Sequence, residues 1–230
     1  MTPTAVFWRR FINRLRFGLG IQEILDRAAR LGVVIYPYVI IYEPILHRPQ
    51  VDRFSARLSV TQLQPHEAEL VASVPERPRD VTRIRELMKT ASCCAIVHND
   101  ELLAYSWFCS EQLRGMGGTN ALCRLPPGWA YLFDMYVRPV VRGRQLAVHL
   151  RHHVQKMLAD RGIEHTCSRS LVFNRSARRF KYKLGAFDVE LRVLLRLKPF
   201  SGVDLRLRRR PWELRLPGLQ PIHAPGRSGS

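Results

Sequence analysis

The sequence lacks a long apolar run. Its longest candidate for a membrane span, residues 33–42, has about ten residues and contains Pro37, whereas a spanning helix needs roughly twenty. The first residues place arginines where a signal peptide requires apolar side chains, so we expect no secretion signal. These features predict a cytoplasmic protein, with peripheral attachment to a membrane left open.

Cysteine is scarce and is not arranged for disulfides or metal. The five cysteines are odd in number, contain no Cys-x-x-Cys motif, and include an adjacent pair at Cys93 and Cys94 in an apolar run. We expect these cysteines to act as small apolar residues. A histidine group at 149, 152 and 153 has no accompanying carboxylate or third ligand, so we predict no metal site.

Acidic residues are also few. There are 19 of them against 37 Lys and Arg, which gives a net charge of +18. The excess is concentrated in residues 1–30, 138–183 and 198–230, and a field of this kind attracts anions. The chain as a whole has 46% apolar and 24% charged residues, which is the composition of a globular protein. Its length of 230 residues fits one domain with appendages.

The N-terminal region predicts a basic amphipathic helix over residues 5–30. Its apolar side chains recur at three- and four-residue spacing with arginines between them. Such a helix either covers the core or docks on an anionic membrane surface or an acidic carrier protein. We assign residues 1–32 to this extension. A strand should follow at 33–42, and Pro37 predicts that it is an edge strand or carries a bulge.

The rest of the chain predicts one hairpin and then alternating strands and helices. We expect a helix at 79–90, a hairpin of CCAIVH and ELLAYSWFC, a loop at 114–120, strands at 130–137 and 166–173, helices at 146–160 and 177–184, and a last strand pair within 187–197. Residues 201–230 should form a basic, partly disordered tail, weakly ordered after about residue 217.

One strand-to-helix junction carries chemical information. The strand at 130–137 passes through a proline-marked turn into a helix, with Arg142, Gly143 and Arg144 at the junction. The first N–H groups of a helix are unpaired and carry partial positive charge, so they bind phosphate. An ordinary turn with solvated arginines would have the same sequence, so both interpretations, a phosphate site and an ordinary turn, stay open.

The junction and a second segment together resemble the GNAT superfamily of acyltransferases. The family pattern Arg/Gln-x-x-Gly-x-Gly/Ala is matched by Arg142 and Ala147, while Gln145 replaces its central glycine. The second segment, around Asn174, Ala177 and Lys183-Leu184-Gly185, is similar to the family's following helix. The resemblance covers about residues 93–197, and we assign 33–200 to the GNAT-like domain.

The resemblance implies an α/β fold with a mixed sheet and a role for acetyl-CoA or another acyl-CoA as co-substrate. The strands at 130–137 and 166–173 would be parallel neighbours that diverge, and the pantetheine arm would pair with exposed main chain between them. An amine would attack the thioester directly, with the oxyanion held by an N–H near Met135 or Tyr136. The expected cofactor-binding residues are Met135, Tyr136, Val137, Arg142, Gly143, Arg144, Gln145, Leu146, Ala147, Asn174 and Ala177.

Three residues are candidates for proton transfer. Asp134 is a carboxylate in an apolar strand, where burial would make it a stronger base; it is either the base, a substrate ligand or a structural hydrogen-bonding group. By the resemblance, the family's acidic tyrosine falls at Lys181, and Tyr182 lies one residue on, about 100° round the helix. Either Tyr182 is a bystander or the helix is altered locally. Because CoA thiolate leaves readily, a dedicated acid could also be dispensable.

A different class of function competes with this one. The arginine blocks at both ends would also suit a nucleic-acid- or anionic-membrane-binding protein that uses a GNAT-like scaffold without catalysis. The open junction disfavours this reading, because a scaffold needs no free amides there. The expected partners are therefore acyl-CoA, an amine acceptor, and an anionic partner recruited by the basic termini, which is an acidic carrier protein, a membrane surface or nucleic acid.

Overall fold

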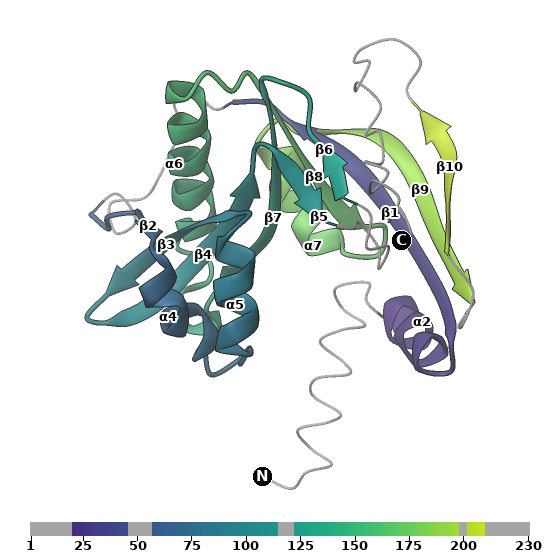
Figure 1. The fold of residues 1–230 in the computed structure, drawn as a ribbon, viewed down its shortest axis with the longest axis horizontal. Helices are drawn as coiled ribbons and strands as arrows, with labels where there is room; N and C mark the ends of the chain where they lie inside the picture. Colours follow the sequence, from purple (N-terminus) through teal and green to yellow (C-terminus); the bar gives the residue numbers. More distant parts are fainter. Residues whose placement is uncertain (1–19, 46–56, 115–121, 198–201, 210–230) are drawn as a thin grey trace, which may run out of the picture.

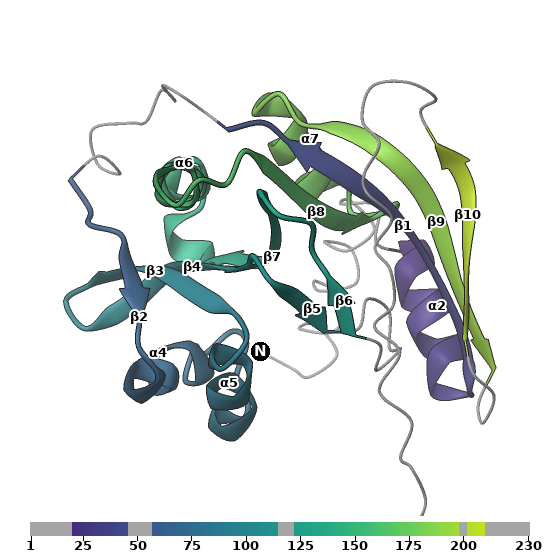
Figure 2. The same cartoon turned by 45° about the horizontal axis from the view of Figure 1, so that its top comes forward.

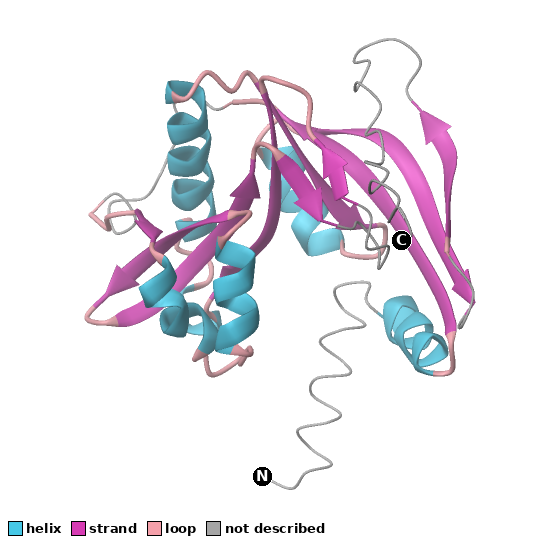
Figure 3. Ribbon diagram, in the orientation of Figure 1, coloured by secondary structure: helices cyan, strands magenta, loops and turns pink. Residues whose placement is uncertain are grey.

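The computed structural model describes residues 20–45, 57–114, 122–197 and 202–209. They form a mixed α/β fold in which helices cover an eight-stranded sheet (Figures 1 and 3). The elements are α2 (Gly20–Arg30), β1 (Val33–Glu43), β2 (Thr61–Leu63), η1 (Pro65–Glu67), α4 (Ala68–Ala72), α5 (Val81–Met88), β3 (Ser92–His98), β4 (Glu101–Cys109), β5 (Gln112–Arg114), β6 (Leu122–Arg124), β7 (Trp129–Val137), η3 (Pro139–Val141), α6 (Leu146–Asp160), β8 (His165–Leu171), α7 (Arg175–Lys183), β9 (Phe187–Leu197) and β10 (Val203–Arg209).

The sheet has the order β10-β9-β1-β8-β7-β4-β3-β2, and β5 pairs with β6 in a separate ribbon. Among the pairs in the large sheet, β7 and β8 are parallel and the others are antiparallel. Figure 2 shows a strongly curved sheet with α6 on one face and α4 and α5 on the other. The predicted α/β class and mixed sheet are confirmed.

Strand alternation divides the core into two layers. In β3, Cys93 and Ala95 pack against α4 and α5, whereas Cys94 and Ile96 face α6. Burial raises the pKa of the Cys94 thiol to about 12. Four of the five cysteines are buried and unpaired, and the side chain of Cys123 lies outside the described residues. The cysteines that the structure describes therefore pack as small apolar groups.

The predicted hairpin and the βαβα order of the second half are confirmed. Strands β3 and β4 pair antiparallel around Asn99 and Asp100, whose φ angles of 50° and 60° belong to the left-handed region. Two consecutive residues in that region match the twist of a hairpin, and Asn and Asp tolerate it. Helix α5 lies within the predicted 79–90.

The position of Pro37 differs from the prediction. Strand β1 is interior, since it pairs with β8 on one side and β9 on the other, and its register irregularity lies between Ile40 and Ile41. The Pro37 carbonyl accepts a hydrogen bond from the Val172 N–H, just beyond the last β1–β8 pair. In an antiparallel ladder a residue's N and O point the same way, so the missing N–H faces the end of the β1–β8 ladder, next to the Val172 hydrogen bond.

Two further predictions are corrected at the C-terminal end of the sheet. Residues 187–197 form one continuous strand, β9, rather than a strand pair. Residues 203–209 form β10, which pairs with β9, so the boundary that we placed at 201 cuts through the sheet. Alternating apolar residues supply the pattern that β10 needs, but its arginines led us to assign it to the tail.

The predicted N-terminal helix is partly described. Residues 20–30 form α2, which packs against β1, while 5–19 lie outside the described residues. Of the loop predicted at 114–120, Arg114 is the last residue of β5, while 115–120 and the segment after 217 lie outside the described residues. In the described part of the chain, no helix is long and apolar enough to cross a membrane.

Asp204 anchors β10 to the sheet. Its Oδ2 accepts hydrogen bonds from the buried Tyr38 hydroxyl at 2.6 Å and from Arg192 Nη1 at 3.0 Å. We expect Asp204→Ala to lower the free energy of unfolding by roughly 1–3 kcal/mol, because it leaves the Tyr38 hydroxyl unpaired. Urea denaturation measures this loss. The matched change Asp160→Ala, at the exposed end of α6, should stay within about 0.5 kcal/mol, and equal effects would contradict the anchoring role.

Candidate active site

The centre of the sheet opens into a cleft between β7 and β8. These strands pair over only four positions, from Trp129 with His165 to Leu132 with Ser168. Both strands continue beyond that point without pairing to each other, which confirms the predicted parallel, diverging strands. The resulting cleft has a volume of about 820 Å³. It is lined by Tyr36, Arg77, residues 132–137, Arg142, Ala147, Arg151, residues 169–171, Asn174, Ser176, Ala177, Phe180 and Lys181.

A β-bulge shapes the β7 wall of this cleft. The register between β4 and β7 shifts between Tyr105 and Trp107, and Asp134 has a φ of 46°. A non-glycine residue in the left-handed region is strained, and bulges of this kind redirect side chains next to functional sites. The bulge leaves Asp134 and Met135 without a partner in β4, and regular pairing resumes where Tyr136 meets Tyr105.

The far end of the cleft is the N-terminus of α6. Gly143 and Gln145 have φ angles of 86° and 55°, and a Cβ added to Gly143 would meet nothing within 4 Å. The N–H groups of Gly143, Gln145, Leu146 and Ala147 donate no hydrogen bond to any residue that the structure describes. Gln145 thus takes the backbone conformation that glycine adopts most easily, so the departure from the family pattern keeps the turn and leaves the amides open.

The predicted cofactor-binding residues fall into two groups. Those with atoms on the cleft surface are Met135, Tyr136, Val137, Arg142, Ala147, Asn174 and Ala177. The others, Gly143, Arg144, Gln145 and Leu146, form the turn and first helical position, and the Leu146 side chain packs in the core. Asn174 also caps α7, because its Oδ1 accepts a hydrogen bond from the Ala177 N–H at 3.1 Å.

The carboxylate of Asp134 is held by two guanidinium groups. Its Oδ1 lies 2.5 Å from Arg77 Nη1 and its Oδ2 lies 2.7 Å from Arg79 Nη1. Arg77 also donates to the Tyr105 hydroxyl at 3.0 Å. Both carboxylate oxygens are therefore engaged, which favours the structural alternative for Asp134 over the role of a general base. The sequence did not single out either arginine.

A buried ionic cluster lies under the cleft, on the side of α6 and α7. Glu43 of β1 forms ion pairs with Arg151 of α6 at 3.4 Å and with Lys181 of α7 at 3.5 Å. Ser168 donates to Glu43 and accepts from the Lys181 amine at 2.6 Å. Glu43 and Arg151 are each only 2% exposed, and Lys181 is 7% exposed. The cluster joins two strands and both cleft helices.

The cluster shifts the pKa values of its members in a consistent way. Burial lowers the pKa of Lys181 from 10.5 to about 8, although Glu43 opposes that shift. Burial alone would raise the pKa of Glu43, but Arg151, Lys181 and the Ser168 hydrogen bond outweigh it and the net shift is downward. The two cations exceed the one anion, so the amine is the member most easily neutralised.

The two residues proposed for the acid role have different surroundings. Lys181 lines the cleft, whereas Tyr182 does not and is 39% exposed. The Tyr182 hydroxyl donates to Asp188 at 2.6 Å and accepts from Arg178 at 2.7 Å. Successive helical residues differ by about 100°, and α7 is regular here. This geometry favours the alternative in which Tyr182 is a bystander.

Several site residues were missed by reasoning from the sequence. Glu43 gave a weak signal, since it ends a long apolar strand, and the alternation in β8 places Ser168 and Ser170 on one face. Arg151 gave none among the other basic residues of α6. In the described part of the chain, no three His, Cys, Asp or Glu side chains are grouped closely enough to hold a metal ion.

Lys181 should make the free energy of unfolding depend on pH in the alkaline range. Because its folded pKa is depressed, the unfolded chain binds more protons between about pH 8 and 10.5, so this group's contribution to the free energy of unfolding rises with pH in that window. We expect the free energy of unfolding of the wild type minus that of Lys181→Met, both from urea denaturation, to increase from pH 8 to pH 10. The exposed Lys183→Met should show no such trend, and a flat difference for Lys181→Met would contradict the assignment.

Comparisons with solved structures agree with this geometry. A protein from Novosphingobium aromaticivorans, described as a GNAT-family acetyltransferase, aligns with a TM-score of 0.51 and 18% identity over 74% of this chain and 69% of its own. A Drosophila protein aligns with a TM-score of 0.51 and 14% identity over 79% of this chain, which spans 58% of that structure. At these identities the likeness shows the fold alone.

The sequence comparisons define the family. No curated protein matches the chain. Residues 60–186, more than half of the chain, match the model of the acetyltransferase (GNAT) family. That range contains the bulge of β7, the open N-terminus of α6 and the Asn174 cap. The chain therefore belongs to the GNAT family of acetyltransferases.

Proposed function

We propose that this protein is an acyl-CoA-dependent N-acyltransferase that moves an acyl group from acetyl-CoA or another acyl-CoA directly to an amine. The observation that carries the proposal is the cleft: β7 and β8 stop pairing after Leu132 and Ser168, and the opening leads to the unpaired N-terminus of α6. An extended arm can pair with the freed strand edge, and a pyrophosphate can bind the helix amides.

The residues of the cleft divide the work of holding the co-substrate. The open amides of Gly143, Gln145, Leu146 and Ala147 would bind the phosphates. The side chain of Arg142 would assist them, since it lies on the cleft surface and its Nε donates to the Val137 carbonyl at 3.1 Å. The freed main chain of Met135 to Val137 would bind the arm. When bound, acyl-CoA supplies the activated carbonyl carbon.

The chemistry needs an oxyanion donor and a proton for the departing thiolate. A main-chain N–H at Met135 or Tyr136, redirected by the bulge, would donate to the oxyanion. Lys181 would stabilise the thiolate, because its amine lies at the cleft floor with a pKa of about 8. Asp134 would act as a positioning residue that fixes Arg77 and Arg79 at the mouth.

The anionic partner expected for the basic termini stays a prediction. Residues 1–19 and 210–230, which carry most of that charge, lie outside the described residues. Arg206 of β10 is paired with Glu190 at 3.7 Å, so part of the C-terminal charge is compensated inside the sheet. Cytoplasmic location and peripheral membrane attachment stay proposals for the same reason.

The phosphate site can be tested at Gly143. Calorimetry with acetyl-CoA and with CoA should show binding to the wild type, and Gly143→Glu should abolish it by placing a carboxylate beside the phosphates. Gly162→Glu is the matched control, because Gly162 has a φ of 78° and equally open surroundings at the other end of α6. Both variants carry the same backbone strain, of order 1–3 kcal/mol. Equal CoA affinity in the two variants would refute the phosphate assignment.

A further inference from the structure

The face of the cleft opposite α7 carries an arginine with free hydrogen-bonding capacity. In β8, Ser168 bonds to Lys181 of α7, so the next residue, Arg169, points to the other face. There its guanidinium lies over the rings of Tyr36 and Tyr38, with its Cζ 5.5 and 5.1 Å from their centroids. Tyr36 and Arg169 both line the cleft.

Stacking orients this guanidinium without using its N–H groups. The Nη1 of Arg169 is buried and has no hydrogen-bond partner among the described residues, and none of their carboxylates pairs with it. A buried charged donor without an acceptor costs free energy in the free protein. A planar guanidinium that is fixed on aromatic rings beside a cleft suits bidentate binding of a carboxylate.

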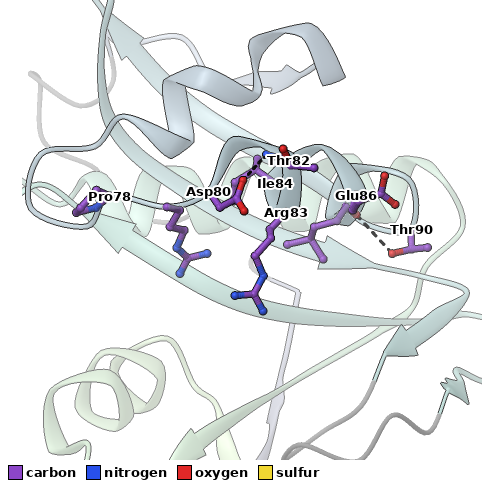
Figure 4. A pocket seen from close by; sticks show the side chains of 9 residues that line it. Pro78, Asp80, Thr82, Arg83, Ile84, Glu86 and Thr90 are labelled. Atoms are coloured by element: carbon purple, nitrogen blue, oxygen red, sulfur yellow. Dashed lines mark hydrogen bonds between the residues drawn. The ribbon is translucent and has the colours of Figure 1, made fainter.

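The charge balance on this face supports the same conclusion. Asp134 is already neutralised by Arg77 and Arg79, so Arg169 adds positive charge that nothing in the described chain compensates. A neighbouring cleft of about 770 Å³ along α5 is lined by Arg79 and Arg83 but also by Asp80 and Glu86, so it adds no net charge (Figure 4). A polycationic amine would be repelled from this mouth, whereas an anionic substrate would be attracted.

We propose that the substrate of this protein carries a carboxylate, which Arg169 binds on the Tyr36–Tyr38 platform while the amine reacts. The inference rests on the proposed acyl transfer. The amine nitrogen forms a bond to the thioester carbon, the carbon–sulfur bond breaks, and the proton lost by the amine balances the CoA thiolate. The carboxylate belongs either to the acceptor, as in an amino acid or peptide, or to the acyl group, as in a dicarboxylic acyl-CoA.

A matched panel distinguishes these two sources. Thiol release from acetyl-CoA would be followed with free amino acids and dipeptides, each beside its C-terminal amide, and with spermidine. In a second arm, succinyl-CoA would be compared with butyryl-CoA. We expect one arm to show at least a tenfold preference in kcat/KM for the carboxylate form, and spermidine to be a poor acceptor in both.

The variant Arg169→Met keeps a long side chain over the tyrosines and removes the charge. It should abolish the preference mainly through KM, while CoA affinity from calorimetry stays within about twofold. Arg169→Lys should retain part of the preference, because it keeps the charge without the fork. Arg161→Met, which makes the same change at the far end of α6, should leave the preference intact.

The outcomes separate this inference from the proposed function. If the wild type binds CoA but shows no preference for a carboxylate in either arm, or acylates nothing in the panel, the assignment of Arg169 is overturned and the CoA site stands. A preference that survives in both Arg169→Met and Arg169→Lys overturns it as well. If the folded wild type does not bind CoA, the proposed function itself fails.

Discussion

The position of the site depends on the short parallel pairing of β7 with β8, which has only four residue pairs. Because parallel neighbours need a crossover, the chain must leave the end of β7, form α6 and return to the start of β8. The helix therefore begins at the same end of the sheet at which the strands diverge. The cleft, its freed strand edges and its unpaired amides all follow from where the pairing stops, at Leu132 and Ser168.

Buried polar groups connect two strands of the sheet to the two helices that flank the cleft. Glu43, Arg151 and Lys181 connect β1, α6 and α7 around the Ser168 hydroxyl. The free energy lost when three charges leave water offsets much of the free energy gained from their attraction, so the cluster is a poor source of net stability. Its geometry instead fixes one arrangement of the two cleft helices, and it leaves Lys181 with a pKa near 8 at the cleft floor. The site thus has positive charge on both faces, from Lys181 on the side of α7 and from Arg169 on the other.

The parts of the site that could be predicted are those whose signal is local. The turn with Gly143, the start of α6 and the cap at Asn174 depend on residues within a few positions of each other. The hairpin at Asn99 and Asp100 is of the same kind. Three features were out of reach: the bulge at Asp134, the harmless position of Pro37 and the strand β10. Each depends on which neighbour lies alongside, and strand preferences change with that neighbour.

By itself, the sequence determined the hairpin, the alternation of strands and helices from residue 130 to 184, the strand-to-helix turn at Gly143 and the family resemblance, because periodicity and turns act over short distances. The tertiary structure alone decided which charges meet. Tyr38 reaches Asp204 across 166 residues, and Glu43 reaches Ser168 across 125. It also decided that Asp134 is neutralised while Arg169 is not. A charged side chain takes its role from the partners that burial brings within a few ångströms, and no short stretch of sequence specifies them.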